Sequence, residues 1–153
     1  MTPNRITIHC SATPNGEDYD VEKIRRYHVD ELGWSDVGYH LIVQPSGVVQ
    51  RGRDFRVQGA HVSGYNEGNV GVCLVGTDQF TMDQFDPGLR TYLGYLKRTF
   101  GVPAHEIFRL HNEFDDSKTC PNIEKGALYA WYYEDDTSGL PLCPSTRQLR
   151  GLR

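Results

Sequence analysis

The chain has 153 residues, of which 38% are hydrophobic and 24% are charged, a composition typical of one globular domain with a hydrophobic core. The net charge of −4 argues against nucleic-acid binding, which needs a clustered basic face. No apolar run reaches the length of a membrane span or of a signal peptide, so we expect the protein to stay in the compartment where it is made.

The first predicted element is a strand over residues 6–10, ITIHC. Because side chains of a strand alternate between its faces, Ile6, Ile8 and Cys10 share one side, and Thr7 and His9 share the other. Cys10 is therefore expected in the core. His9, just before the polar loop SATPNG, is placed to line a cleft, although a lone histidine is more often a hydrogen-bonded structural residue.

The next elements are a helix, a hairpin and a long loop. Apolar residues recur at helical spacing from about Val21 to Glu31, with Asp20 as the N-cap. Two strands, 39–44 and 48–51, flank the turn PSG. Residues 54–69 are rich in Gly, Asn and Ser and predict a surface loop, and loops of that length are often functional.

The second half alternates strands and helices. An apolar strand is expected at 70–75, with Cys73 buried in it, and a helix from about Pro87 to Phe100. A short strand at 107–110 and an aromatic helix at 122–135 complete the chain of elements. This order predicts a single α/β domain in which helices flank a central mixed β-sheet.

A second histidine follows a strand in the segment RLHNEFDDSKTCPN (109–122). His111 comes at the end of the short strand, as His9 comes near the end of the first, and Cys120 lies nine positions later in a polar loop. Two imidazoles and one thiolate leave the fourth position of a tetrahedral zinc ion open, which is typical of a catalytic site. By spacing alone an alternative stays open, in which His111 caps a loop and Cys120 is an inert thiol.

Four segments occur in order between about residues 5 and 132: ITIHCSAT, GWSDVGYHLIV, GAHVSGYNEGNVGVCLVG, and FRLHNEF followed by SKTCPN. Together they resemble the zinc-dependent N-acetylmuramoyl-L-alanine amidases of type 2, a family that includes amidase-type phage lysozymes and peptidoglycan recognition proteins. The resemblance implies a mixed sheet flanked by helices, with a zinc cleft on one face.

The resemblance also assigns metal ligands. By position, the zinc ligands of the family fall on His9, His111 and Cys120, with one Zn²⁺ per chain. Some branches of the family carry aspartate at the third position, whereas this chain has the thiolate.

Catalytic and substrate-binding roles follow in the same way. The catalytic tyrosine of the family falls on Tyr39 and its catalytic lysine on Lys118, while His61 and Asn66 match the loop that lines the substrate groove. Without the family pattern, Tyr39 would be a half-buried strand aromatic and Lys118 a solvated loop charge. His40 should point to the face opposite Tyr39, so we expect only Tyr39 to reach the cleft.

The implied reaction is hydrolysis of the amide bond between N-acetylmuramic acid and L-alanine in bacterial peptidoglycan. With the compact single domain, this suggests a phage endolysin that causes host cell lysis, made in the host cytoplasm and acting on the cell wall or periplasmic peptidoglycan. We expect a monomer. Some phage members of the family bind a phage RNA polymerase, but the short segment before the first strand gives that partner no support.

Three other functions compete with the zinc amidase. The chain could be a non-catalytic peptidoglycan-binding module, a thiol hydrolase that uses Cys120 with His111, or a glycosidase. The cysteine argues against the binding module, because the resemblance associates loss of this ligand with loss of catalysis. A chelator would separate the zinc amidase from the thiol hydrolase.

The sequence places the catalytic domain at residues 1–136 and a short basic tail at 137–153. Arg147, Arg150 and Arg153 lie in this tail, which has no acidic residue. We expect a loosely ordered, solvated terminus, with contact to an anionic surface as the alternative. Cys143, between two prolines, has no assigned role.

Overall fold

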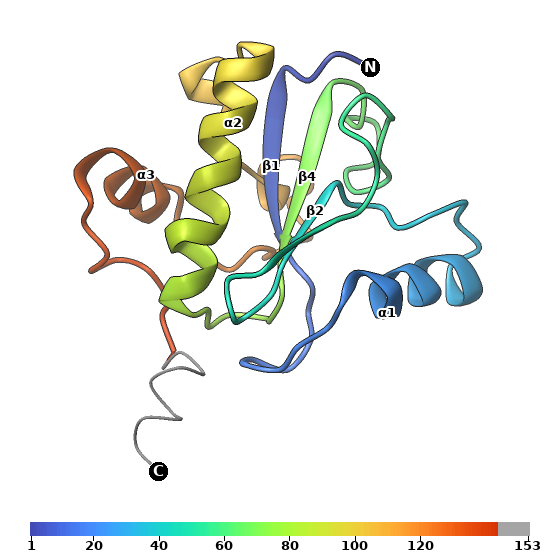
Figure 1. Ribbon diagram of the computed structural model, residues 1–153, viewed down its shortest axis with the longest axis horizontal. Helices are drawn as coiled ribbons and strands as arrows, with labels where there is room; N and C mark the ends of the chain where they lie inside the picture. The colour runs from blue at the N-terminus through green and yellow to red at the C-terminus, as the bar shows by residue number, and fades with distance from the viewer. Residues whose placement is uncertain (144–153) are drawn as a thin grey trace.

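A five-stranded mixed sheet runs through the middle of the protein (Figure 1). The computed structural model describes residues 1–143. Neighbouring strands pair in parallel, except for the antiparallel hairpin of β2 and β3. Across the sheet the order is β3 (Val49–Arg51), β2 (Leu41–Val43), β4 (Asn69–Leu74), β1 (Arg5–Cys10) and β5 (Arg109–Leu110).

The central strands are buried on both faces, as expected for parallel strands covered by helices. Alternation along β1 holds as predicted: Ile6 and Ile8 belong to the larger core cluster together with Cys10, which is only 7% exposed. Thr7 and His9 face the other side, and His9 lies beside Cys73 of β4 in the register of the sheet. His9, the candidate metal ligand in this strand, is therefore directed away from the main core.

One face of the sheet is covered by the first helix, α1 (Val21–Arg26), which continues into a wider helical turn at Tyr27–Glu31 (Figure 1). The predicted N-cap is confirmed, because the Asp20 carboxylate accepts a 2.7 Å hydrogen bond from the backbone N–H of Lys23. Ile24 of α1 packs in a small cluster with residues of β2 and β4.

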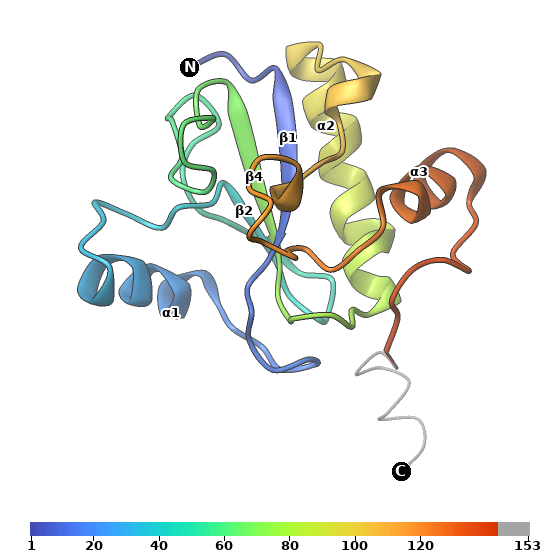
Figure 2. The same ribbon diagram turned by 180° about the vertical axis from the view of Figure 1, so that it is seen from behind.

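The opposite face carries α2 (Arg90–Phe100) and α3 (Lys125–Glu134), which both views show on the side away from α1 (Figures 1 and 2). A wider helical turn at Gln84–Leu89 leads into α2, and two 3₁₀ turns lie at Ala104–Glu106 and His111–Glu113. The core side chains of these helices are fully or almost fully buried: Leu93, Leu96, Leu128 and Trp131. The prediction of a mixed sheet flanked by helices is confirmed.

The start of the predicted tail packs on the domain. Leu140 is 7% exposed and belongs to the main core, and the backbone around Phe80 exchanges hydrogen bonds with Pro141 and Cys143. The packed part of the chain thus reaches at least Cys143. The three arginines of the tail lie outside the described residues.

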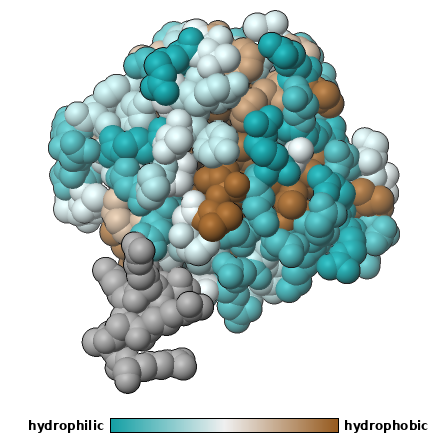
Figure 3. All heavy atoms as spheres, in the orientation of Figure 1, coloured by the Kyte–Doolittle hydropathy of each residue, from teal (hydrophilic) through white to brown (hydrophobic). Residues whose placement is uncertain are grey.

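The surface in the orientation of Figure 1 is mainly hydrophilic, with hydrophobic residues gathered near its centre (Figure 3). Most large apolar side chains are turned inward, as the core clusters require. Within residues 1–143, no helix has both the length and the apolar composition needed to cross a bilayer.

Candidate metal centre

The strand register brings His9 and His111 together. β1 and β5 run in parallel with Ile8 paired to Leu110, so the residue that follows each of them lies at the same edge of the sheet. The two imidazole rings have centroids 4.6 Å apart. Just after β5, the Glu113 carboxylate accepts a hydrogen bond from the backbone N–H of Leu110, which secures the turn that begins at His111.

The loop after this turn carries the third candidate ligand, Cys120. Its carbonyl accepts a 3.1 Å hydrogen bond from the backbone N–H of Asn112, and its sulfur accepts a 3.2 Å hydrogen bond from that of Cys10. One ring nitrogen of each histidine and the Cys120 sulfur lie within 4.8 Å of one another. The three residues predicted to bind a metal therefore converge at one point.

The donor set and its spacing fit zinc. Two tetrahedral ligands at the usual zinc–nitrogen and zinc–sulfur distances lie about 3.5 Å from each other. The Cys120 sulfur is 4.0 Å from Nδ1 of His9, close to this separation without any rearrangement of the backbone. Two nitrogen donors and one sulfur donor are also the ligand types that zinc prefers.

Burial keeps the two histidines neutral, as metal binding requires. Burial, together with the neighbouring rings of His61 and His111, lowers the pKa of His9 well below its usual value. Burial and the Lys118 ammonium lower the pKa of His111. The hydrogen bond with the Cys10 thiol and burial raise the pKa of the Cys120 thiol, so a cation is needed to keep this sulfur ionised.

Tyr39 lies beside the cluster. Its ring centroid is 5.2 Å from that of His9 and 5.5 Å from that of His28. Burial raises the pKa of Tyr39 well above its usual value, so the phenol keeps its proton and is a hydrogen-bond donor near neutral pH. The next residue, His40, uses both ring nitrogens on backbone groups, those of Gly71 and Val57.

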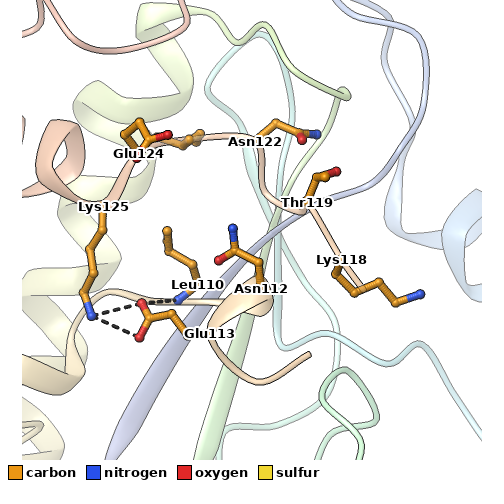
Figure 4. Close-up of a pocket in the computed structure, with 9 residues that line it drawn as sticks. Leu110, Asn112, Glu113, Lys118, Thr119, Asn122, Glu124 and Lys125 are labelled. Atoms are coloured by element: carbon orange, nitrogen blue, oxygen red, sulfur yellow. Dashed lines mark hydrogen bonds and ion pairs between the residues drawn. The ribbon is translucent and has the colours of Figure 1, made fainter. Parts of the chain in front are cut away.

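Lys118 is exposed at the rim of a cavity of about 720 Å³, which is lined by neighbours in sequence of the candidate ligands His111 and Cys120. In Figure 4 its side chain points away from the ion pair of Glu113 and Lys125, which lies on the other side of this cavity. The remaining lining residues include Asn112 and Thr119. The ammonium is thus free of a carboxylate partner within the described residues, while its charge acts on His111.

The predicted groove residues lie in the long loop before β4. His61 is buried, with Nδ1 2.9 Å from Nε2 of His9 and Nε2 3.0 Å from the carbonyl oxygen of Asn69. Asn66 is half-buried, and its side-chain oxygen accepts hydrogen bonds from the backbone N–H groups of His61 and Val62. The amide nitrogen of Asn66 keeps its donor capacity.

Two features of the site were not anticipated from the sequence. The His28 ring packs against Trp34 with centroids 4.6 Å apart and the planes tilted by 45°, so the aromatic surface around Tyr39 extends to the helical turn at Tyr27–Glu31. Asn69 is fully buried and accepts a 2.8 Å hydrogen bond from the hydroxyl of Thr7. Polar residues at the start of an apolar strand and on the His9 side of β1 were the available signals.

Comparison with known proteins places this geometry in a family. The family model for N-acetylmuramoyl-L-alanine amidase matches residues 1–123. The chain belongs to the N-acetylmuramoyl-L-alanine amidase family. The resemblance drawn from the four sequence segments is thereby confirmed, as is the prediction of an amidase.

Curated relatives and solved structures of the amidase family agree. The chain is 38% identical over 136 residues to the endolysin of Escherichia phage T7, covering 86% of each chain. It is 51% identical over 141 residues to the endolysin of Klebsiella phage KP32, covering 87% of each. The N-acetylmuramoyl-L-alanine amidase LysC from Clostridium intestinale superposes with a TM-score of 0.73 at 25% identity, covering 84% of each chain.

Proposed function

We propose that this protein is a zinc-dependent phage endolysin that hydrolyses the amide bond between N-acetylmuramic acid and L-alanine in bacterial peptidoglycan. The observation that carries the proposal is the convergence of His9, His111 and Cys120 within 4.8 Å in a chain of the amidase family. Three protein ligands leave one position open, which is typical of catalytic rather than structural zinc.

The three ligands would hold one Zn²⁺ per chain. Bound there, zinc would supply Lewis acidity, which activates water and polarises the amide carbonyl. Neutral His9 and His111 present lone pairs, and the Cys120 sulfur, which accepts a backbone N–H, would be held as a thiolate by the bound cation. The protein's own contribution is to hold these donors on two neighbouring strand ends and one braced loop.

The neighbouring side chains have complementary roles in the proposal. The protonated Tyr39 phenol donates a hydrogen bond that orients the attacking water or the tetrahedral centre. The Lys118 ammonium stabilises the negative charge that develops on the carbonyl oxygen. The loop that contains His61 and Asn66 forms one wall of the substrate groove, with the free amide nitrogen of Asn66 as a donor to the glycan or peptide.

A thiol hydrolase fits this site less well. A nucleophilic cysteine needs a lowered pKa, whereas the surroundings of Cys120 raise it. A non-catalytic binding module would have no use for three converging metal donors. A glycosidase would need a pair of carboxylates across the scissile bond, which the three metal donors of this site do not supply.

The test measures zinc content and both candidate products on purified peptidoglycan. We expect about one zinc per chain, new free L-alanine amino groups and no new reducing ends. Cys120→Ser should lose zinc and turnover, while Cys143→Ser, a matched change at a cysteine outside the cluster, should keep both. Full activity of the chelated protein, or of Cys120→Ser, would contradict the metal site.

The proposed place of action is the cell wall, with the protein made in the host cytoplasm and active as a monomer. Size-exclusion chromatography with light scattering checks the monomer.

A further inference from the structure

His61 makes a defined hydrogen bond with each of its two ring nitrogens. Nε2 lies 3.0 Å from the carbonyl oxygen of Asn69, and Nδ1 lies 2.9 Å from Nε2 of His9. A carbonyl oxygen can only accept a hydrogen bond, so Nε2 of His61 carries a proton and donates it. Whether Nδ1 of His61 also carries a proton then decides which nitrogen of His9 is protonated.

Only one proton fits between the two facing nitrogens. If Nδ1 of His61 carried it, this ring would hold two protons and a positive charge in a buried position, between a carbonyl oxygen and another imidazole. Burying a charge that no carboxylate offsets is unfavourable. A neutral His61 therefore accepts at Nδ1, and His9 donates from Nε2.

This arrangement leaves Nδ1 of His9 without a proton. The same atom lies 4.0 Å from the Cys120 sulfur, on the side of the candidate metal site. His9 thus donates to His61, which donates to the carbonyl of Asn69, and this hydrogen-bonded chain leaves a free lone pair on Nδ1 of His9, where a metal ligand is needed. Ligating histidines usually donate their second N–H directly to a carboxylate, carbonyl or water. Here a second histidine is inserted into that chain.

The position of the His61 ring is fixed by its surroundings. A Cβ atom added to Gly71 of β4 would lie 2.7 Å from the ring, and one added to Gly59 would also lie 2.7 Å from it. The absence of a side chain at both glycines thus leaves the space that the imidazole occupies. Asn66 secures the backbone of His61, and the hydroxyl of Thr7 hydrogen-bonds the side chain of Asn69.

We infer that His61 is a positioning residue for the metal site, which selects the tautomer of His9 and orients its Nδ1 toward the metal. This inference rests on the zinc site of the proposed function. It gives His61 a role inside the protein rather than at the substrate.

The first test reads the tautomers directly. Long-range ¹H–¹⁵N NMR spectra of the metal-free, folded chain should show a protonated Nε2 and an unprotonated Nδ1 for both His9 and His61. His9→Gln and His61→Asn spectra assign the signals. A proton on Nδ1 of His9 in the metal-free protein would overturn the inference. Because no zinc is present, this result is independent of whether the protein is a zinc amidase.

The second test measures the zinc dissociation constant by competition with a chromophoric chelator. His61→Leu removes the acceptor, and we expect binding to weaken by about 10- to 100-fold, the usual effect of losing such a partner. His61→Asn places an oxygen near the former Nδ1 and should recover part of the affinity. Zinc affinity of His61→Leu equal to that of the wild type would refute the positioning role.

His40→Gln is the matched control. His40 is also a fully buried histidine with a ring centroid 5.8 Å from that of His61, but it hydrogen-bonds only backbone groups. We expect this variant to keep the zinc dissociation constant and the His9 tautomer of the wild type. If both histidine variants lose zinc equally, the effect is general destabilisation and the inference fails. If the wild type itself binds no zinc, the proposed function fails, and the tautomer measurement still decides the inference.

Discussion

Gly71→Ala offers a test of how tightly the packing of the sheet controls the proposed metal site. The added methyl group would lie 2.7 Å from Cδ2 and Cγ of His61 and 2.9 Å from its Nδ1. Carbon atoms in contact prefer separations of about 3.5 Å or more, so the ring must move by roughly 0.8 Å or the strand must shift. β4 is fully buried at the centre of the sheet, which makes movement of the ring the cheaper response.

The expected cost has two parts. Overpacking of this kind typically lowers the free energy of unfolding by about 1–3 kcal/mol. A ring displaced by nearly 1 Å also cannot keep both the 2.9 Å contact with His9 and the 3.0 Å contact with Asn69. We therefore expect zinc binding to weaken by roughly 10-fold or more in the folded variant.

Denaturant unfolding of the metal-free protein and chelator competition measure the two effects separately. Gly126→Ala is the control, because its added methyl group meets nothing within 4 Å and the residue lies in the first turn of α3. That change should leave zinc binding intact and raise stability by up to about 1 kcal/mol. A Gly71→Ala protein with wild-type stability and zinc affinity would refute the packing argument.

Three further predictions follow from other parts of the structure. Trp131→Ala should lower the free energy of unfolding by about 3–5 kcal/mol in a denaturant titration, because it empties a fully buried site and removes the 2.8 Å hydrogen bond from the indole to Asp86. Lys118→Met should lower kcat by about 10²- to 10³-fold while zinc content stays at the wild-type level, and equal losses of zinc and kcat would contradict a role in charge stabilisation. Burial lowers the pKa of His40 to about 4 from 6.5, so the unfolded chain takes up the proton first. His40 therefore does not reduce the free energy of unfolding above pH 6.5. As the pH falls from 6.5 toward 4, protonation of the unfolded chain lowers this free energy by about 3 kcal/mol in total. Between pH 6.5 and 4, the free energy of unfolding of the metal-free His40→Gln protein should depend less steeply on pH than that of the wild type. An unchanged pH dependence would exclude His40 as its cause.

Much of the fold follows from local patterns in the sequence. Alternation in ITIHC separates Cys10 from His9, and the structure keeps both on their expected sides. Asp20 caps the start of α1 and Gly101 caps the end of α2, and both positions agree with the sequence pattern. These signals are local, because periodicity and capping depend on residues a few positions apart.

The lengths of the helices and strands were harder to predict from the sequence. The predicted strand at 107–110 is reduced to β5, Arg109–Leu110, and the helix expected from residue 122 begins at Lys125. The length of β5 depends on its pairing with β1, a strand about 100 residues away along the chain. Likewise, the packing of Leu140 against the core could not be predicted from the sequence, because an isolated apolar residue between a glycine and a proline gives no periodic pattern.

The sequence by itself determined which residues can form the candidate site. These are a histidine at each of two strand ends and one cysteine in a polar loop, linked by a family pattern. Only the tertiary structure decided which atoms face each other. The parallel register of β1 and β5 places His9 next to His111, and the space left by Gly59 and Gly71 allows His61 to contact His9. The physical reason is that a tautomer depends on the partner of each ring nitrogen, and those partners come from strands far apart along the chain.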